Sequence, residues 1–471
     1  MKSDFIHELS LLIQEHNFIS KDIYDKLDVK RGLRNKNGTG VLVGLTKIGA
    51  VVGYSVEDGK KIPKEGQLYF RGIPLKTLIE KFKEKGNRYA FEKTMFLLLF
   101  GKVPENFELK MFLSTLKELQ NLPEEFIEDF ILRKPSVDIM NQLQRTVLCL
   151  YTLDPNPDSV ELNNLINQTL NLIAKFPSLL VYCYQATNYK HFNKSLIIHN
   201  PVEEYSIAEN ILHMLRPDNK FTELEAEILD LILVIHAEHG GGNNSTFTSH
   251  VVSSTRTDTY SSISASIGSL KGPMHGGANS IVTKMIQDIK KNCNYTDREK
   301  LKEYIRKIFE KEAFDKKGKI YGMGHAIYTL SDPRAVLLKE KAYELAKDKD
   351  SLEEFKLFSD IEELTKEVGK ELKGEDFTIC ANVDLYSGFV YNLLDIPQNI
   401  FTPLFALARI ASWNAHRIEQ IIIDKKLMNR EDNINFKISM EKLKKEMNTE
   451  YFDDLTSYYS KNCKKIEEGK I

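Results

Sequence analysis

The fold class is decided by residues 70–100, FRGIPLKTLIEKFKEKGNRYAFEKTMFLLLF. On both sides of the break at Gly86 and Asn87, apolar side chains recur every three or four residues, which is the spacing of a helix that buries one face. The apolar positions are Leu75, Leu78, Ile79 and Phe82, followed by Phe91, Met95, Phe96 and Leu99. We therefore expect two helices here, separated by a turn.

The same periodicity continues through most of the chain, with short polar connections. Further helices are expected at residues 106–120, 137–152, 158–186, 203–215, 222–238, 297–312, 333–348, 352–372 and 400–428. Residues 4–27 also have helical spacing, and they end at a basic, glycine-rich passage. Between residues 41 and 70, glycines and the turn at Glu57-Asp58-Gly59 separate short apolar runs, so small strands are expected only there. The sequence predicts an all-α protein with minor β-structure near residues 41–70.

The composition is that of an ordinary globular protein, with 42% hydrophobic and 28% charged residues. The 65 basic and 67 acidic residues give a net charge of −2, so there is no basic field to hold nucleic acid or an anionic membrane. An anionic ligand must therefore be held by individual, locally placed arginines.

The cysteines and the N-terminus indicate the compartment. Five cysteines are scattered without a Cys-x-x-Cys pair, which argues against a disulfide framework or a thiolate zinc site. Residues 1–18 lack the unbroken apolar stretch of a signal peptide, and the longest apolar runs are too short to span a bilayer. We expect a cytoplasmic protein with small-molecule substrates and no nucleic-acid or membrane partner.

Glycine and histidine are concentrated in residues 236–250, 271–279 and 321–334, which are expected to be loops or helix starts and not helix interiors. Glycine beside histidine suits a place where the backbone approaches a ligand and an imidazole points at it. These three segments are the candidate site.

His236 and His239 are three residues apart, which places both rings near one helix face and invites a metal interpretation. The spacing is not that of a His-Glu-x-x-His site, and no cysteine cluster supplies further ligands. No metal is therefore expected, although a metallohydrolase built on these two histidines and His250 is an alternative.

His275 lies just before the apolar helix that begins near Ala278. The helix dipole disfavours a charged ring there, so a neutral imidazole could donate a hydrogen bond to a developing oxyanion, or simply cap the helix. His325 follows a glycine turn that could expose amides to a phosphate, and Arg334 lies nine residues further on.

Two further residues have a structural and a functional interpretation. Asp384 precedes a helix and could be its N-cap. Arg409 stands in an apolar helix, where a cation is costly unless an anion pairs with it. A substrate carboxylate or a buried acidic side chain would serve.

In this order, the segments resemble the citrate synthase family from about residue 30 to residue 420, including FRGIPLKTLIEKF, FEKTMFLLLFGKVP and FTPLFALARI. The resemblance implies a large domain formed by residues 1–275, with an N-terminal extension at 1–30, and by residues 385–471. A smaller inserted domain, residues 276–384, would close over the substrates. It also implies a homodimer or an assembly of dimers and a reaction without a cofactor.

The resemblance also implies roles for single residues. His275 would hydrogen-bond the thioester oxygen of acetyl-CoA, Asp384 would remove the methyl proton, and His325 would polarise the carbonyl of oxaloacetate. The expected oxaloacetate-binding residues are His239, Arg334 and Arg409. The expected CoA-binding residues are Tyr321, Gly322, Met323 and Gly324.

The family usually supplies a further arginine from the neighbouring subunit, where this chain has Asn429 followed by Arg430. This departure leaves two alternatives open: the preference for oxaloacetate need not be strict, or the chain can be an inactive helical binding protein. Independently of it, the acyl donor can be propionyl-CoA with 2-methylcitrate as product, because one extra methylene changes selectivity only slightly.

Overall fold

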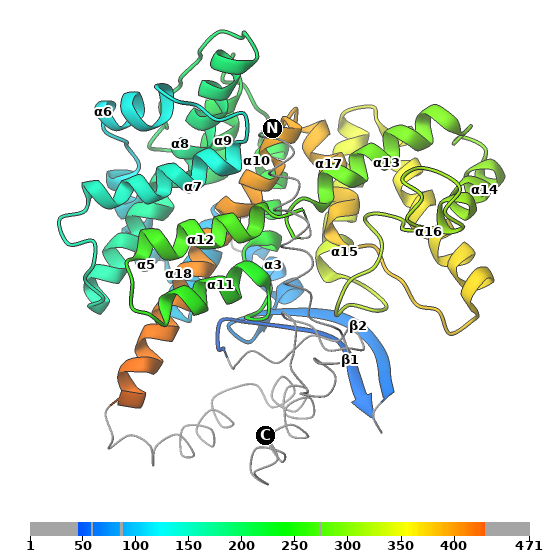
Figure 1. Ribbon diagram of the computed structural model, residues 1–471, viewed down its shortest axis with the longest axis horizontal. Helices are drawn as coiled ribbons and strands as arrows, with labels where there is room; N and C mark the ends of the chain where they lie inside the picture. Colours follow the sequence, from blue (N-terminus) through cyan, green and yellow to red (C-terminus); the bar gives the residue numbers. More distant parts are fainter. Residues whose placement is uncertain (1–45, 58–59, 85–87, 274, 429–471) are drawn as a thin grey trace, which may run out of the picture. The chain divides into compact units, whose positions relative to one another are not determined.

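The computed structural model describes residues 46–57, 60–84, 88–273 and 275–428, which belong to one compact unit that begins at Gly44 (Figure 1). The predicted helix at residues 4–27, the extension 1–30, and Asn429 with Arg430 lie outside the described residues.

Helices form most of the described chain, as predicted. The first half contains α3 (Leu75–Glu84), α4 (Ala90–Phe100), α5 (Asn106–Leu119), α6 (Glu124–Phe126), the π-helix η1 (Ile127–Leu132), α7 (Ile139–Cys149), the 3-10 helix η2 (Leu150–Leu153), α8 (Leu162–His191), α9 (Ile207–Leu215) and α10 (Glu223–His236). The second half contains α11 (Asn244–Ser253), α12 (Thr259–Lys271), α13 (Ala278–Asn292), α14 (Arg298–Phe309), α15 (Pro333–Asp348), α16 (Leu352–Lys373), α17 (Val383–Leu393), the 3-10 helix η3 (Gln398–Ile400) and α18 (Phe401–Met428).

Two of the three strands in the described chain lie within the range expected for them, and the third, Ile73–Pro74, lies just beyond it. β1 (Gly49–Glu57), β2 (Lys60–Phe70) and β3 (Ile73–Pro74) form an antiparallel sheet in the order β1-β2-β3. The register pairs Gly49 with Phe70 and shifts between Val52 and Tyr54, so the hairpin is bent at this irregularity.

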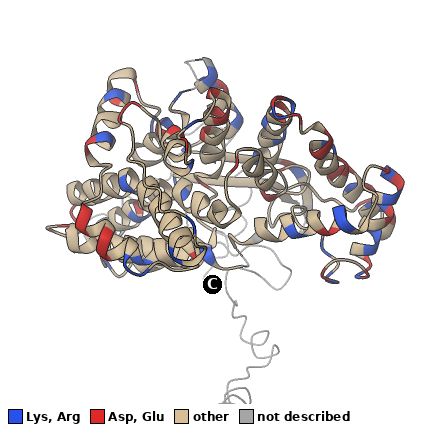
Figure 2. Ribbon diagram, turned by 90° about the horizontal axis from the view of Figure 1, so that it is seen from above, with Lys and Arg blue, Asp and Glu red and all other residues tan. Residues whose placement is uncertain are grey.

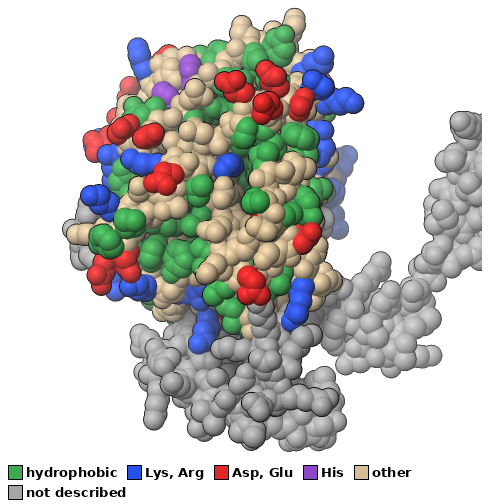
Figure 3. Space-filling view, turned by 90° about the vertical axis from the view of Figure 1, so that its left-hand side faces the viewer, with side chains coloured by type: hydrophobic (Ala, Val, Ile, Leu, Met, Phe, Trp, Pro, Cys, Tyr) green, Lys and Arg blue, Asp and Glu red, His purple; other side chains and the backbone are tan. Residues whose placement is uncertain are grey.

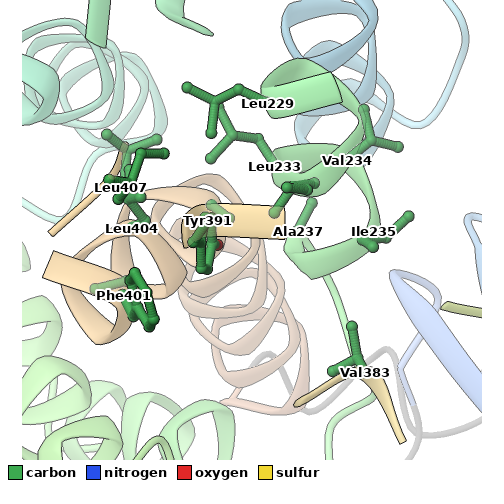
Figure 4. Packing of buried hydrophobic residues seen from close by; sticks show 14 of the residues in the cluster. Leu229, Leu233, Val234, Ile235, Ala237, Val383, Tyr391, Phe401, Leu404 and Leu407 are labelled. Atoms are coloured by element: carbon green, nitrogen blue, oxygen red, sulfur yellow. The ribbon is translucent and has the colours of Figure 1, made fainter. Parts of the chain in front are cut away.

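The core is organised around α18, which contacts α4, α7, α8, α10, α11 and α12. Its residues up to Arg417 are almost all buried, and a helix apolar on every side needs such neighbours all around it. Figure 4 shows Leu404 and Leu407 of α18 beside Leu233 of α10 and Tyr391 of α17. Arg409 and Trp413 are thus held in the most buried part of the described chain.

Helices α13 to α17 pack on one another, with α14 against α16 and with α13 and α15 against α17 (Figure 1). Most of the predicted small domain, residues 276–384, lies in this group. Its boundaries and its closure over substrates remain predictions.

Several helices were not expected, namely the short α6 with η1, and α11 with α12. α11 and α12 are rich in serine and threonine, and the glycine- and histidine-rich segment 236–250 was expected to avoid helix interiors. That prediction is wrong for His250, which lies inside α11. The small side chains let α11 and α12 approach closely, and buried serines hydrogen-bond across the contact, as Ser253 does with Ser262 at 3.0 Å between hydroxyl oxygens.

The surface carries both charges. Basic and acidic side chains alternate over the described helices in Figure 2, and the face in Figure 3 mixes them with hydrophobic ones. None of the helices in the described part of the chain has the length and apolar character that a bilayer crossing requires.

Candidate active site

Two of the predicted histidines meet in one place. His239 follows α10, and His325 lies between α14 and α15; their ring centres are 5.1 Å apart. The ring of Tyr328 contacts both, in a tilted arrangement with His325 at 4.6 Å between ring centres and edge to face with His239 at 5.7 Å. Nε2 of His239 is buried and has no hydrogen-bond partner among the described residues. Burial and the nearby Arg334 hold the pKa of His239 well below its ordinary value, so the ring is neutral.

The orientation of His325 is fixed by its own loop. Its Nδ1 accepts hydrogen bonds from the backbone N–H groups of Ile327 at 3.1 Å and Tyr328 at 3.2 Å. In the neutral ring the proton is therefore on Nε2, which becomes the hydrogen-bond donor. This is the tautomer needed to polarise a carbonyl oxygen.

His275 lies three residues before α13, as predicted. Its Nε2 is 3.1 Å from the hydroxyl oxygen of Ser245 and 3.4 Å from the backbone nitrogen of the same residue. The indole of Trp413, the only tryptophan in the sequence, donates to that hydroxyl at 3.2 Å. Burial, assisted by Arg409, lowers the pKa of His275 to about 4. The ring is neutral, and because Ser245 donates to Nε2 the proton is on Nδ1.

Arg334 already has an acidic partner. Its guanidinium and Asp332 form a two-point contact, with distances of 3.0 Å from Nε to Oδ1 and 2.7 Å from Nη2 to Oδ2. Burial opposes the charge, but this contact outweighs it and raises the pKa of Arg334 above its ordinary value. The cation is therefore permanent and held rigidly in the site.

Arg409 has no such acidic partner among the described residues. It is only 1% exposed, and its Nε donates to the backbone carbonyl of His236. Its Nη1 is buried without a hydrogen-bond acceptor, and no carboxylate of the described residues lies within 4.0 Å of the guanidinium. Burial lowers the pKa of Arg409 to about 10, so the group is still charged at neutral pH. Of the two partners considered from the sequence, the described residues do not supply the buried acid.

Asp384 is not the cap of its helix. Asn382 caps α17, accepting from the backbone N–H of Asp384 at 3.0 Å, and Asp384 stands in the first turn. Its carboxylate accepts no hydrogen bond from the part of the chain that the structure describes. Burial raises the pKa of Asp384 to about 6, although the nearby Arg334 lowers it. A half-buried carboxylate with this pKa is a stronger base than an ordinary aspartate.

The glycine turn links His325 to Asp384. Gly324 donates its backbone N–H to the carbonyl of Cys380 at 2.7 Å, and Asn382 donates its own to the carbonyl of Gly322 at 2.9 Å. Gly322 has a φ of 85°, and an added Cβ there would lie 3.0 Å from the Cα of Leu385. Tyr321 turns its hydroxyl to Asp315, at 2.6 Å. The glycines thus serve packing, and the CoA-binding role of residues 321–324 stays a prediction.

Comparison with known proteins identifies the family of this chain. The family described as Citrate synthase, C-terminal domain, matches residues 37–430. This chain belongs to the citrate synthase family. It is 35% identical to Citrate synthase 2 of Bacillus subtilis over 332 residues, which cover 70% of this chain and 82% of that protein. It is also 30% identical to the 2-methylcitrate synthase of Shewanella oneidensis, covering 75% and 84% of the two chains.

The fold agrees with this assignment. The crystal structure of citrate synthase from Thermotoga maritima matches with a TM-score of 0.63 at 30% identity, covering 82% of this chain and 91% of that chain. The prediction of a citrate synthase-like all-α fold is therefore confirmed.

The candidate site also contains residues that the sequence analysis did not single out. Tyr328 and Asp332 lie in the loop with His325, and Ser245 and Trp413 hold His275 from two other helices. Asp332 had a local signal, since an acid two residues before Arg334 is close enough to pair. The contact between Ser245 and Trp413 spans 168 residues and has no local signal.

The β1–β2 hairpin supports the loop that carries His325. The hydroxyl of Thr329 donates to the backbone carbonyl of Gly53 at 2.6 Å, and the backbone N–H of Gly66 donates to the hydroxyl of Ser331 at 3.1 Å. A Cβ on Gly66 would collide with the backbone of Ser331 and lie 2.7 Å from Cδ1 of Tyr328. Glycine is required here because two backbones meet.

The structure does not bring together the three histidines on which the metallohydrolase alternative depends. His236 packs its ring on Phe405 at 4.3 Å between centres, and His239 faces His325. His250 instead contacts His416 and Gln420, so the three histidines proposed from the sequence do not form one cluster within the described residues.

Proposed function

We propose that this protein condenses acetyl-CoA with oxaloacetate and hydrolyses the resulting thioester to give citrate and CoA. The observation that carries the proposal is the pair of buried polar nitrogens without partners in the described chain near Arg334, which itself lies near Asp384. Nη1 of Arg409 and Nε2 of His239 are both buried without partners among the described residues. Because unpaired buried donors are costly, a site with this much unmatched hydrogen-bonding capacity favours an anionic ligand rich in acceptors.

The first half of the reaction is removal of a proton from the acetyl methyl group. Such a proton is only weakly acidic, so the base must act while a donor stabilises charge on the thioester oxygen. Asp384, with a pKa of about 6, is the proposed base. His275, neutral and protonated on Nδ1, is the proposed donor, and Ser245 holds it in that tautomer. The N–H group at Nδ1 of the neutral ring can thus donate a hydrogen bond to the thioester oxygen as negative charge develops there.

The second half is attack of the enol on the ketone of oxaloacetate. Arg334 and Arg409 are the proposed partners of its two carboxylates, with His239 as a further donor. His325 would donate from Nε2 to the carbonyl and then protonate the new alkoxide, in keeping with the tautomer set by its backbone contacts. Fixed donors of this kind need no reorganisation during the reaction.

A second acyl donor is supported by the relative named 2-methylcitrate synthase. Propionyl-CoA differs from acetyl-CoA by one methylene, which is worth only about 1–3 kcal/mol of discrimination in an apolar pocket. The choice between citrate and 2-methylcitrate as the product is therefore made by comparing the two acyl donors in the assay.

The test follows release of the CoA thiol by purified protein given oxaloacetate and either acetyl-CoA or propionyl-CoA. We expect release that depends on oxaloacetate and is lost in Asp384→Asn. The matched control is Asp376→Asn, which changes an exposed aspartate in the loop before α17 and should retain the wild-type rate. The ratio of the two wild-type rates identifies the preferred donor.

No release with either thioester, from a protein whose helical spectrum is intact, would contradict the proposal and favour the inactive binding protein. Release that survives in Asp384→Asn would leave the reaction in place but remove Asp384 as its base.

We further propose that the protein acts in the cytoplasm without a cofactor, as a homodimer or an assembly of dimers. Its thiols support a reducing compartment, because Cys149, Cys183, Cys293 and Cys380 are all free. Light scattering of the full chain measures the assembly directly.

A further inference from the structure

A cluster of potential metal ligands lies where α11 meets α18, beyond the residues assigned to substrate. Nε2 of His250 is 3.1 Å from Nδ1 of His416. Oε2 of Glu419 is 3.9 Å from the same Nδ1, and all three atoms lie within 4.8 Å of one another. His416 and Glu419 are three residues apart on α18, so both side chains face the same side of that helix. The hydroxyl of Thr46 is 3.4 Å from Nδ1 of His416.

The outer nitrogens of both imidazoles are already bound. Nε2 of His416 is 3.1 Å from Oε2 of Glu238, and Nδ1 of His250 is 3.1 Å from Oε1 of Gln420. Both partner oxygens are acceptors, so each outer nitrogen carries a proton. In neutral rings, this arrangement leaves the lone pairs of the two inner nitrogens facing each other.

Two facing lone pairs at 3.1 Å repel unless a cation lies between them. The cation can be a proton, shared as an N–H···N hydrogen bond, or a metal ion. The carboxylate of Glu419 distinguishes a shared proton from a metal ion. Oε2 of Glu419 is buried and has no hydrogen-bond donor among the described residues, while its Oε1 accepts from the backbone N–H of Lys47 at 2.9 Å. A shared proton leaves that oxygen unpartnered, whereas a metal ion would bind it.

We propose that His250 Nε2, His416 Nδ1 and Glu419 Oε2 bind a divalent transition-metal ion of the zinc type. Two imidazoles and one carboxylate form a ligand set that such ions favour over magnesium or calcium, which prefer all-oxygen sites. The carboxylate of Glu238 and the amide of Gln420 are the outer partners that orient ligating imidazoles in metal sites. Water would complete the coordination.

The ion would act as a structural clip. It joins α11 to α18, the two helices that also hold His275 through Ser245 and Trp413. Glu238, which binds His416, also accepts hydrogen bonds from the hydroxyl of Ser412 and the backbone N–H of Gly240. Because Glu238 directly precedes His239, the ion would steady the loop between the clip and the substrate site. The inference does not rest on the proposed reaction.

The experiment uses the full chain, stripped with a chelator, dialysed and titrated with Zn²⁺ by calorimetry, with cobalt absorption as a second probe. We expect one ion per chain and an increase in the melting temperature. Loss of an outer partner alone weakens metal binding by about 10–100-fold. Because His250→Gln and Glu419→Gln each remove a direct ligand, we expect the affinity for Zn²⁺ to fall by at least this factor in both variants. The control is His191→Gln. His191 is an exposed histidine that contacts the carbonyl of Pro135, so its replacement should leave the affinity for Zn²⁺ unchanged.

The two variants keep the test decisive if one of them does not fold. Equal affinity in wild type, in Glu419→Gln and in His191→Gln would show adventitious binding and overturn the proposal. Failure of the stripped wild type to bind Zn²⁺ would also overturn it, leaving a shared proton between His250 and His416. Both results are independent of thiol release, so they do not depend on the fate of the proposed reaction.

Discussion

At the scale of single residues, the site trades stability for reactivity, and Asp384 is the clearest case. Its pKa is raised to about 6 by burial, and Arg334 compensates only in part. A folded-state pKa above the ordinary 3.8 means that the native protein binds this proton more tightly than the unfolded chain does. The stability gained from that proton is present below about pH 4 and is lost as the pH rises through about 6.

Asp384→Asn should therefore stabilise the protein while it abolishes thiol release. The amide carries no charge to bury, so at pH 7.5 we expect a gain on the order of 1–3 kcal/mol in the free energy of unfolding. Removal of a general base should lower kcat by about 10²–10⁴-fold. Thermal melting and the thiol assay measure the two effects on one preparation. A lower melting temperature would contradict the assignment of Asp384 as a carboxylate whose charge is destabilised by partial burial.

The same carboxylate predicts the pH dependence of the reaction. The base works only when deprotonated, so kcat/KM should fall tenfold per pH unit below about 6. His275 does not set this limb, because its pKa of about 4 lies lower. Initial rates across pH 4.5–8 at constant ionic strength would locate the limb, with the thiol detected after quenching. A limb near the ordinary aspartate value would argue against Asp384 as the base.

At the scale of elements, the hairpin of β1 and β2 is coupled to the loop that carries His325. Gly66→Ala places a methyl group against the backbone of Ser331 and the ring of Tyr328, so the loop must move. We expect kcat/KM to fall by about 10²-fold, because small displacements of catalytic groups have effects of this size. The helical circular dichroism should stay unchanged.

The matched control is Gly272→Ala, where the added methyl group meets only the carbonyl of Ser269, at 3.4 Å. It should keep wild-type activity. Equal loss of activity in both variants, or none in either, would show that the contact between the hairpin and the loop does not position His325.

The elements also show what the sequence could and could not predict. Helices such as α15 and α18 were expected at nearly the observed bounds, since their apolar residues recur at helical spacing. α11 and α12 were missed because their serines and threonines favour caps and turns in isolation. Within the protein these hydroxyls are satisfied internally, as Ser266 is by the carbonyl of Ser262 at 3.1 Å. Packing against α18 thus overrides local propensity.

The candidate site divides in the same way. Each expected residue stood in a local motif, and His239, His325 and Arg334 do lie together. The clip of His250 and His416 could not be predicted, and no metal was expected. The two residues are 166 positions apart, and the single pair of His416 and Glu419, three residues apart, does not by itself indicate a metal site.

At the scale of the whole molecule, buried carboxylates act in opposite directions on acid stability. Although burial raises the pKa of Glu225, its contacts with Arg216 and Lys349 outweigh this and lower the value to about 2. That stability is present above pH 4.5 and is lost as the pH falls toward 2. Burial raises the pKa of Glu92 instead, as it does that of Asp230 beside it, and Lys93 opposes the shift. Their contribution is present in acid and is lost as the pH rises.

Glu92→Gln should remove the loss of stability that ionisation of Glu92 causes at higher pH. Glu92 is 1% exposed, and its Oε1 accepts from the backbone N–H of Ile207 at 2.7 Å, which the amide oxygen of glutamine can also do. We expect a gain of about 1–3 kcal/mol at pH 8 and a much smaller change at pH 4.5. Denaturant melts at the two pH values measure the difference. Exposed Glu80→Gln is the control and should show no pH-dependent change; an equal gain at both pH values in Glu92→Gln would refute the ionisation argument.

The single tryptophan makes the site visible without a label. Trp413 is fully buried, and its indole reaches His275 through one serine hydroxyl. All the indole fluorescence of this chain therefore arises two hydrogen bonds away from the group assigned to the thioester. Excited at the red edge of the aromatic band, the protein should emit in the blue, and protonation of His275 near pH 4 should quench this emission. Rapid mixing with a thioester would then record, in real time and on unmodified protein, the moment at which the site is filled.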